Sequence, residues 1–318
     1  MSNRHIPQLD LSHYRSGTAE EKKRFVRAWG DGLKEFGFIS IINHGVDDAL
    51  IRRTYADAER LFALPLEVKK HYDIAGGGGQ RGYTSFGKEH AKNRKVGDLK
   101  EFWHVGRDLP ANAPKRSAYG NNVWPSELST FQMNAHDLFG ALDAAAAVML
   151  HALADYFEMP RNVFSDMAND GNSILRIIHY PPLKDMFTPG GVRAAEHEDI
   201  NLITLLCEST SSGLEILTRQ NEWIAVDALK GQIVVDSGDM LSRVTNEVIP
   251  STTHRVVNPT SADDDVVRYS MPFFVHPYPD CPLRVFDQCI SAETPKKFED
   301  TTADVFLKQR LREIGLIK

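Results

Sequence analysis

Residues 197–206 read His197-Glu198-Asp199-Ile200-Asn201-Leu202-Ile203-Thr204-Leu205-Leu206. Two side chains that commonly bind metals thus stand directly before an apolar run, and such a run is typical of a buried β-strand. Side chains two positions apart on a strand point to the same side, so we expect His197 and Asp199 to face one ion while Glu198 points away. The stretch predicts a β-rich fold with a metal site.

A later histidine completes a set of three ligands. His254 lies in the segment Ser251-Thr252-Thr253-His254-Arg255-Val256-Val257. Two imidazoles and one carboxylate are the ligands of non-haem Fe(II) centres that keep coordination positions open for substrate and oxygen. A His-x-Asp pair also occurs by chance in many chains, so the metal assignment depends on the surrounding motifs.

The third motif is Arg268-Tyr269-Ser270, which opens the strand-like run Met271 to Val275. Arg268 and Ser270 share one face of such a strand. A guanidinium group pairs with a carboxylate through two parallel hydrogen bonds, and a neighbouring hydroxyl adds a third. The motif predicts a carboxylate-binding site, whereas an isolated Arg-x-Ser would be interpreted as a solvated strand end.

The two halves of the chain have different periodicities. Thr18 and Glu21 form a predicted capping box before a helix that ends at Gly37, and a long Ala-rich helix is predicted from Ser126 to Phe157. After Asn172 the sequence changes to short β-branched and aromatic runs, typical of a sandwich or barrel. Strands are predicted near Ile174–Tyr180, Ile200–Cys207, Leu214–Thr218, Trp223–Val226, Gln232–Val235, Thr253–Val257 and Val267–Val275.

The order His-x-Asp, His, Arg-x-Ser resembles the signature of the Fe(II)- and 2-oxoglutarate-dependent oxygenases, in particular their isopenicillin N synthase-like branch. The likeness extends over most of the chain. Its further motifs are Ile6-Pro7-Gln8-Leu9-Asp10-Leu11, Gly37-Phe38, Asn43-His44-Gly45-Val46, Phe62 to Lys70, Gly238-Asp239-Met240-Leu241 and Thr245-Asn246.

The resemblance implies a mainly β fold with flanking helices, built on a double-stranded β-helix (a cupin-like jelly roll). It also implies a dioxygenase, an oxidoreductase that couples O2 and the decarboxylation of 2-oxoglutarate to the oxidation of a small organic substrate. The reaction class stays open between hydroxylation, desaturation and cyclisation. The implied iron ligands are His197, Asp199 and His254, and the implied contacts of 2-oxoglutarate are Arg268, Ser270 and Tyr180.

Two alternatives remain at this point. Many plant members of the family have Asn two residues before the position of Tyr180, where this chain has Ile178. Isopenicillin N synthase itself uses O2 without 2-oxoglutarate and also has the Arg-x-Ser pair, so one alternative is an O2-dependent oxidase or cyclase of that type. Gln80 and Thr84 replace the Arg and Tyr that hold its peptide, which counts against penicillin formation. The other alternative is a catalytically silent jelly-roll binding protein.

The pocket for the prime substrate is expected after Gly76-Gly77-Gly78-Gly79, a run that we interpret as a mobile loop rather than a phosphate-binding loop. The resemblance implies pocket residues near Arg81, Tyr83 and Phe86. His104, on a predicted strand, is a further candidate, with a structural histidine as the other interpretation.

The predicted organisation has four parts. Residues 1–120 form an N-terminal mixed helical region, residues 121–170 a scaffold helix region, residues 171–280 the jelly-roll core, and residues 281–318 a C-terminal helix that could cover the pocket as a lid.

Composition restricts the partners. The net charge is −6 and the isoelectric point is near 6.1, which predicts no binding to nucleic acid or to an anionic membrane surface. The basic stretch from Lys88 to Lys100 is diluted by Glu89 and Asp98, so we interpret it as a solvated loop. The expected partner is a small molecule, and no oligomeric state is predicted.

The cysteines indicate the compartment. Cys207, Cys281 and Cys289 are few, odd in number and without metal-like spacing. Such a set suits a reducing compartment rather than a disulfide framework. No apolar run in the sequence reads as a membrane span or a secretion signal. The sequence therefore predicts a cytoplasmic protein.

Overall fold

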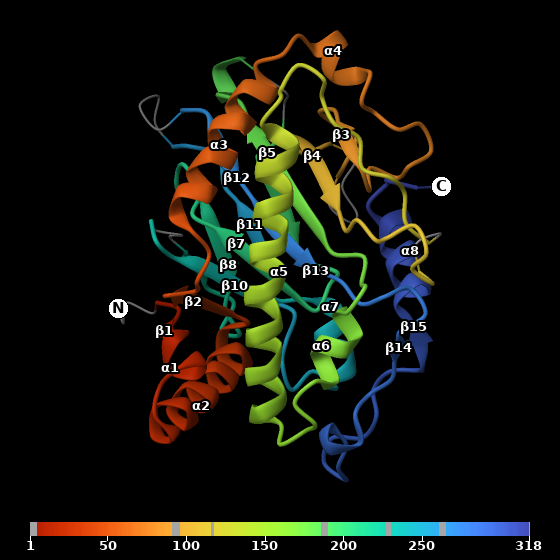
Figure 1. Ribbon diagram of the computed structural model, residues 1–318. Helices are drawn as coiled ribbons and strands as arrows, with labels where there is room; N and C mark the ends of the chain where they lie inside the picture. The colour runs from red at the N-terminus through yellow and green to blue at the C-terminus, as the bar shows by residue number, and fades with distance from the viewer. Residues whose placement is uncertain are drawn as a thin grey trace.

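The computed structural model describes residues 5–90, 96–115, 118–185, 190–226, 230–260 and 265–317. Two sheets face each other in this part of the chain, in the jelly-roll arrangement that was expected (Figure 1). In order, the large sheet contains β1 (Gln8–Asp10), β2 (Phe38–Ile42), β10 (Ile233–Ser237), β7 (Ile203–Cys207), β13 (Pro272–Val275), β5 (Ile174–Tyr180), β4 (Glu101–Gly106) and β3 (Gly82–Thr84), and β12 (Arg268–Ser270) also pairs with β5. The small sheet contains β6 (Ala194–His197), β11 (His254–Val256), β8 (Leu214–Leu217) and β9 (Trp223–Ala225).

Helices cover the outer face of the large sheet, and the longest of them, α5, crosses it in front (Figure 1). The helices are α1 (Ser12–Arg15), α2 (Ala19–Phe36), α3 (Asp48–Phe62), α4 (Leu66–Lys70), α5 (Phe131–Tyr156), α6 (Val163–Ala168), α7 (Asp239–Val244) and α8 (Ala303–Glu313). Short 3-10 helices lie at Leu183–Asp185 and Asp287–Cys289, and β14 (Pro282–Leu283) pairs with β15 (Thr301–Thr302).

The predicted ends of α2 are confirmed. The Thr18 hydroxyl accepts a hydrogen bond from the Glu21 backbone N–H at 3.3 Å, and the Glu21 carboxylate accepts one from the Thr18 backbone N–H at 2.7 Å. Gly37 ends the helix at a φ of +67°, where a Cβ would lie 2.1 Å from the Thr252 hydroxyl. Only glycine combines this backbone conformation with so close an approach.

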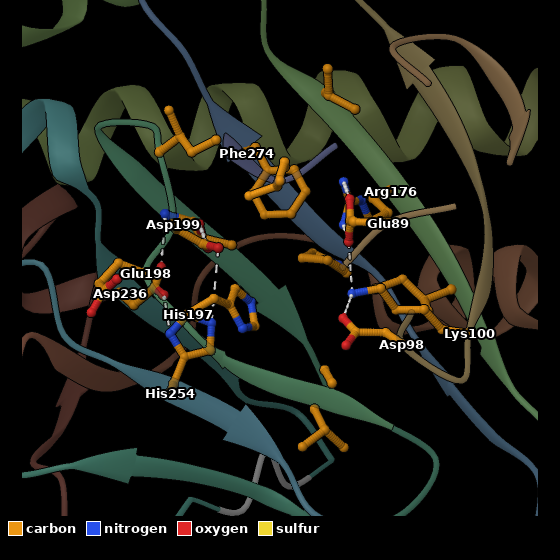
Figure 2. A pocket seen from close by; sticks show the side chains of 18 of the residues that line it. Glu89, Asp98, Lys100, Arg176, His197, Glu198, Asp199, Asp236, His254 and Phe274 are labelled. Carbon is orange, nitrogen blue, oxygen red and sulfur yellow. Dashed lines mark hydrogen bonds and ion pairs between the residues drawn. The ribbon is translucent and has the colours of Figure 1, made fainter. Parts of the chain in front are cut away.

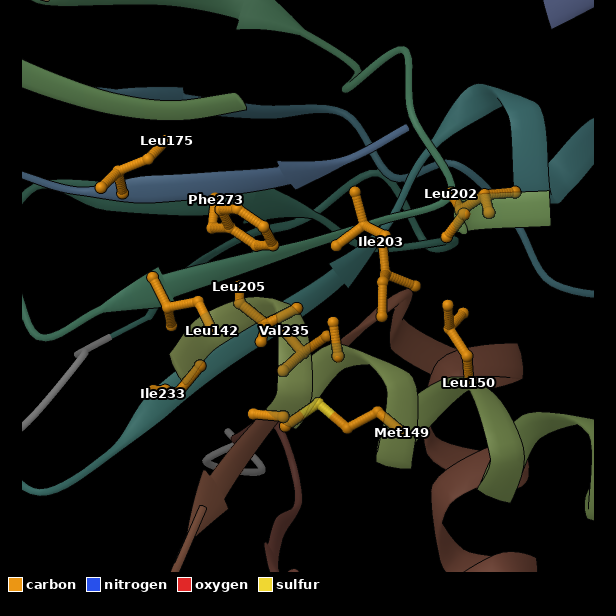
Figure 3. Packing of buried hydrophobic residues seen from close by; sticks show 14 of the residues in the cluster. Leu142, Met149, Leu150, Leu175, Leu202, Ile203, Leu205, Ile233, Val235 and Phe273 are labelled. Atoms are coloured by element: carbon orange, nitrogen blue, oxygen red, sulfur yellow. The ribbon is translucent and has the colours of Figure 1, made fainter. Parts of the chain in front are cut away.

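Strict alternation divides the side chains of the large sheet between two environments. On β5, Leu175 and Ile177 pack into the core that includes α5, whereas Arg176 and Ile178 face the small sheet. The same alternation on β7, β10 and β13 buries Ile203, Leu205, Ile233, Val235 and Phe273 against Leu142, Met149 and Leu150 of α5 (Figure 3). A two-residue period thus builds the core on one face and leaves the other face for a site.

Helix α5 is long and apolar enough to cross a membrane, but 56% of its most apolar window is buried inside the fold. It packs against α2, α3 and the strands of the large sheet. Its apolar composition is therefore that of a core helix.

The strand predicted across residues 200–207 is shorter than expected. β6 ends at His197 and β7 begins at Ile203, so Asp199 lies in the connecting turn. The Asp199 carbonyl accepts a hydrogen bond from the Asp239 backbone N–H at 2.7 Å at the start of α7, which takes this backbone out of a strand ladder. Gly238 permits the approach, since a Cβ there would lie 2.8 Å from the Asp199 carbonyl oxygen.

Replacing Phe273 by alanine is expected to lower the free energy of unfolding by about 3–5 kcal/mol. The Phe273 ring is fully buried and packs edge-to-face on Phe139 of α5 at 4.9 Å between ring centroids. Urea denaturation measures the loss. Met133→Ala, at a 58% exposed position of α5, is the control and should change stability by less than about 0.5 kcal/mol. A loss below about 1 kcal/mol for Phe273→Ala would contradict this account of the core.

Candidate active site

A cavity lies between the two sheets and is lined by both. The large sheet contributes side chains of β5, β7, β10, β12 and β13, and the small sheet those of β6, β8 and β11. His197, Asp199 and His254 stand together at one end, and a cluster of charged side chains faces them across the cavity (Figure 2).

The three predicted metal ligands converge. His197 ends β6 and His254 opens β11, and the two residues are directly opposite each other in the strand register. One ligand atom from each of His197, Asp199 and His254 lies within 4.8 Å of the other two. Strand pairing therefore brings together residues that are far apart in the sequence, and the donor set is that of a non-haem Fe(II) centre.

Backbone hydrogen bonds orient both imidazoles. Nδ1 of His197 is 2.7 Å from the carbonyl oxygen of Ala195, and Nδ1 of His254 is 3.1 Å from that of Thr252. Since a carbonyl only accepts, each Nδ1 carries the proton and each Nε2 has a lone pair for a metal. Burial and the neighbouring His197 lower the pKa of His254 to about 4, which keeps this ring neutral.

The Asp199 carboxylate is held by a short chain of hydrogen bonds. The Thr204 hydroxyl donates to Oδ2 of Asp199, and the Asn201 side-chain amide donates to the Thr204 hydroxyl at 2.9 Å. Oδ1 of Asp199 faces Nε2 of His254 at 3.9 Å. One carboxylate oxygen is thus engaged by the protein, and the other points to the place where the two imidazoles converge.

A second buried carboxylate, Asp236, stands behind the histidines. It accepts a hydrogen bond from the Thr204 backbone N–H at 3.2 Å, and its Oδ2 is 3.9 Å from Nδ1 of His254. Burial and the negative charge of Asp199 raise its pKa well above the usual value. Sequence reasoning missed Asp236, although a carboxylate inside the apolar run Ile233–Ser237 was a visible signal.

Arg268 and Ser270 lie side by side on β12 and line the cavity. Arg268 is only 1% exposed, and its guanidinium carbon lies 5.0 Å from the centre of the Tyr180 ring. Its Nε donates to the Ser211 carbonyl at 3.2 Å, while its buried NH1 has no partner among the described residues. A buried guanidinium group with an unpaired nitrogen favours the binding of an anionic ligand, which would supply the missing hydrogen-bond acceptor.

A second buried arginine, Arg193, lies near Arg268 but is not among the residues that line the cavity. Its guanidinium donates to the Val266 carbonyl at 2.6 Å. Burial and the charge of Arg268 lower its pKa. No carboxylate of the described residues forms an ion pair with either arginine, although the charge of Asp265 partly offsets that of Arg193.

Glu198 is not among the converging donor atoms, as expected. It is exposed and its carboxylate accepts a hydrogen bond from the Thr253 hydroxyl, although the residue also counts among those lining the cavity. Figure 2 shows it beside the three candidate ligands. Because β6 ends at His197, Glu198 and Asp199 lie in the turn that follows rather than on a continuing strand.

The four predicted substrate-pocket residues divide in two. His104 lines the cavity, whereas Arg81, Tyr83 and Phe86 are not among its lining residues. The Tyr83 hydroxyl donates to the Glu101 carboxylate at 2.5 Å on the other face of β4, and the Arg81 guanidinium donates to the Asn172 side chain at 3.3 Å. Strand alternation on β3 thus turns Tyr83 away from the cavity.

The stretch from Lys88 to Lys100 was wrongly interpreted as a solvated loop. Glu89, Asp98 and Lys100 are all buried, at 9%, 4% and 5% exposure, and line the cavity. They pair with one another and with Arg176 of β5, so burial is compensated by opposite charge. Lys92, Arg94 and Lys95 lie outside the described residues. An arginine inside the apolar run Ile174–Tyr180 was the available signal.

Two family models match the chain. Residues 6–127 match the N-terminal model described as "non-haem dioxygenase in morphine synthesis", and residues 171–277 match the "2OG-Fe(II) oxygenase superfamily". The second match contains all three candidate metal ligands together with Arg268 and Ser270.

Relatives of similar length support the same assignment. The 2-oxoglutarate-dependent dioxygenase citB of Monascus ruber is 31% identical over 300 residues, which cover 90% of this chain and 89% of that protein. The proline hydroxylase buaE of Petromyces alliaceus is 29% identical, with coverage of 96% and 98%.

Solved structures have the same fold. A 2OG-Fe(II) oxygenase family protein of Caulobacter crescentus superposes with a TM-score of 0.87 at 40% identity, covering 98% of this chain and all of that one. A full-length Neurospora crassa protein in complex with alpha-KG (2-oxoglutarate) and thymine superposes with a TM-score of 0.85 at 28% identity, covering 98% and 97%.

Fold, family and site agree. The jelly roll, the matched models and the relatives that align over most of their length all point to the use of Fe(II) and 2-oxoglutarate, as the sequence motifs predicted. The chain belongs to the 2OG-Fe(II) oxygenase superfamily and is an Fe(II)- and 2-oxoglutarate-dependent dioxygenase.

Proposed function

We propose that His197, Asp199 and His254 bind the iron, that Arg268 and Ser270 bind the far carboxylate of 2-oxoglutarate, and that the enzyme hydroxylates a small organic molecule in the same cavity. Tyr180 supports the co-substrate from beneath the Arg268 guanidinium. The observation that carries the proposal is that one cavity joins the converging donor atoms to a buried arginine whose NH1 lacks a partner among the described residues.

Within this proposal each part of the chain has a physical task. When bound, Fe(II), 2-oxoglutarate and O2 supply the oxidising step, in which 2-oxoglutarate becomes succinate and carbon dioxide. Thr204 and Asn201 hold the Asp199 carboxylate, and backbone carbonyls hold both imidazoles, so the donor atoms need no reorganisation. Phe38 packs edge-to-face on His254 at 5.4 Å and limits the access of water.

Small polar substrates are supported by the relatives. One is named a proline hydroxylase, and the Neurospora crassa protein was solved with thymine bound. Ile178 lines the cavity directly opposite Ser270, so it presents an apolar surface where many plant members of the family have Asn. We place the enzyme in the cytoplasm, consistent with its three free and buried cysteines.

We also propose that α8 serves as the lid of this cavity. Leu307, Leu311 and Ile314 line the cavity, and Arg310 forms an ion pair with Asp239 at 3.1 Å. The helix thus joins the C-terminal region to the turn that carries Asp199, because Asp239 is bonded to the Asp199 carbonyl.

Anaerobic addition of Fe(II) and then 2-oxoglutarate tests the proposal. The wild type is expected to develop the metal-to-ligand charge-transfer band in the visible range, and His197→Ala is expected to lose it. His151→Ala is the matched control, since this histidine lies on α5 and bonds to Ser165, outside the cavity. The control should keep the band.

The other outcomes separate the alternatives. Iron binding without the band would favour chemistry of the isopenicillin N synthase type. No iron binding in the wild type would favour a silent binding protein, and an unchanged band in His197→Ala would exclude this residue as a ligand.

A further inference from the structure

Five polar side chains form the wall of the cavity opposite the metal ligands. We call Glu89, Asp98, Lys100, His104 and Arg176 the polar wall. Figure 2 shows four of them facing His197 and His254 across the cavity, with Phe274 between the two groups. Lys100 of the wall lies near Tyr180, so the wall adjoins the Arg268 end of the cavity. The proposed function gives the wall no part in binding iron or 2-oxoglutarate, so the prime substrate is the molecule that it would meet.

The polar wall is a single connected network. The Arg176 guanidinium donates to both carboxylate oxygens of Glu89, at 3.1 and 3.0 Å. The Lys100 ammonium is 2.7 Å from the same carboxylate and 2.8 Å from that of Asp98. The Asp98 carboxylate also accepts from the Ala195 backbone N–H at 3.2 Å, which anchors the network to β6. Such a network has one arrangement and is rigid.

The charges of the polar wall sum to zero. Glu89 and Asp98 balance Lys100 and Arg176, and His104 is neutral. Nε2 of His104 accepts a hydrogen bond from Nε of Arg176 at 2.6 Å, which a protonated ring could not do. Burial and the Arg176 charge lower the pKa of His104 well below its usual value. An ionised substrate group at this wall would lose its hydration without gaining a counter-charge.

Hydrogen-bonding capacity nevertheless remains at the wall, in N–H groups of the two cations as well as in lone pairs of the two carboxylates. A guanidinium has five N–H groups, and three of those of Arg176 have partners among the described residues. Two of the three N–H groups of Lys100 are likewise used. The groups that complement them are neutral acceptors such as carbonyl oxygens.

Aromatic rings fix the plane of the Arg176 guanidinium. Its central carbon lies 4.3 Å from the centre of the Phe102 ring and 5.1 Å from that of Phe274. Phe274 also lines the cavity, so an apolar ring face stands beside the donor groups. A flat molecule meets both surfaces at once.

We propose that the polar wall is the recognition subsite for the prime substrate, and that this substrate is an uncharged ring bearing carbonyl oxygens, of the cyclic amide or imide class. The inference rests on the proposed function, because it assumes that the prime substrate binds between the wall and the iron. Arg176 and Lys100 donate to the substrate carbonyls, and Glu89 and Asp98 keep the two cations neutralised.

Matched pairs of ligands test the substrate class on the wild type. Uracil and orotate share a ring and differ by a carboxylate, as do 2-pyrrolidinone and pyroglutamate. Calorimetric titration into the anaerobic enzyme loaded with Fe(II) and 2-oxoglutarate is expected to show each neutral compound binding at least about tenfold more tightly than its acid. Tighter or equal binding of the acids overturns the proposal. So does the absence of binding by both neutral compounds at millimolar concentration.

Glu89→Gln tests the role of the wall itself. The replacement nearly preserves shape and changes the summed charge from zero to +1, so the ratio of the affinities for orotate and uracil should rise by about tenfold. Glu215→Gln is the matched control: Glu215 pairs with Arg255 at 2.8 Å outside the cavity, and its removal should leave the ratio unchanged. An unchanged ratio in Glu89→Gln would overturn the assignment of the wall.

The charge-transfer band separates this inference from the proposed function. In the proposed function the wall does not bind Fe(II) or 2-oxoglutarate, so a normal band together with tighter binding of the acids refutes the substrate class alone. A missing band in the wild type refutes the proposed function, and with it the basis of this inference. A normal band in Glu89→Gln also shows that the variant is folded.

Discussion

Replacing Asp199 by alanine is expected to weaken Fe(II) binding by about 100-fold or more and to reduce turnover at least as much. Loss of a residue that only supports a ligand already costs about 10–100-fold in metal affinity, and Asp199 supplies the only carboxylate among the converging donor atoms. Anaerobic Fe(II) titration measures the affinity, and succinate formation measures turnover.

Asp236→Asn provides the informative comparison. Asp236 is also a buried carboxylate beside His254, but its Oδ1 is engaged by the Thr204 backbone N–H and it is not part of the converging set. Asparagine keeps the carbonyl that accepts this hydrogen bond, so we expect a loss of iron affinity below about tenfold. If Asp236→Asn lost iron and Asp199→Ala kept it, the assignment of the carboxylate ligand would be reversed.

Replacing Arg268 by methionine is expected to raise the dissociation constant of 2-oxoglutarate by about 100-fold. A hydrogen bond to a charged group contributes up to about 3 kcal/mol, and 1.4 kcal/mol corresponds to a factor of ten in affinity. Titration of the charge-transfer band gives the constant. Turnover at saturating 2-oxoglutarate should change much less, because Arg268 lies at the far end of the co-substrate rather than at the reacting atoms.

A ligand without the far carboxylate isolates the contact. 2-Oxopentanoate keeps the keto acid that would bind iron but has nothing for Arg268 to pair with, so wild type and Arg268→Met should bind it equally. Arg255→Met is the control. Arg255 pairs with Glu215 and Glu196 away from the Arg268 end of the cavity, so its replacement should change the dissociation constant of 2-oxoglutarate by no more than about twofold. Equal 2-oxoglutarate affinity in wild type and Arg268→Met would exclude the clamp.

Local pattern was sufficient for much of the fold. The capping box at Thr18, the glycine at the end of α2 and the alternation along Ile174–Tyr180 depend on residues a few positions apart, and each element formed where it was predicted. The predicted strand from Val267 to Val275 divides into β12 and β13, which pair with different parts of the sheet. Pro272 stands where the two strands divide and has no backbone N–H to donate to a neighbouring strand. Whether this missing donor interrupts a strand depends on which strands lie beside it.

The pocket residues were predicted less well, because the face of an edge strand follows from its register. Tyr83 pairs with Trp103 in the register of β3 and β4 and therefore faces the core rather than the cavity. Motif position indicated the right loop and strand but could not assign the side. His104, one position along β4, lines the cavity by the same alternation.

By itself the sequence determined the kinds of chemical group: two imidazoles and a carboxylate for a metal, and an Arg-x-Ser pair for a ligand carboxylate. These follow from residue identity and short spacing. Tertiary structure decided which charges meet. Glu89 pairs with Arg176, Lys100 pairs with Asp98, and Asp236 stands behind His254. Such contacts depend on strand register and on the placement of loops, which involve residues far apart in the sequence. They matter for stability because an unpaired charge buried inside the fold is costly.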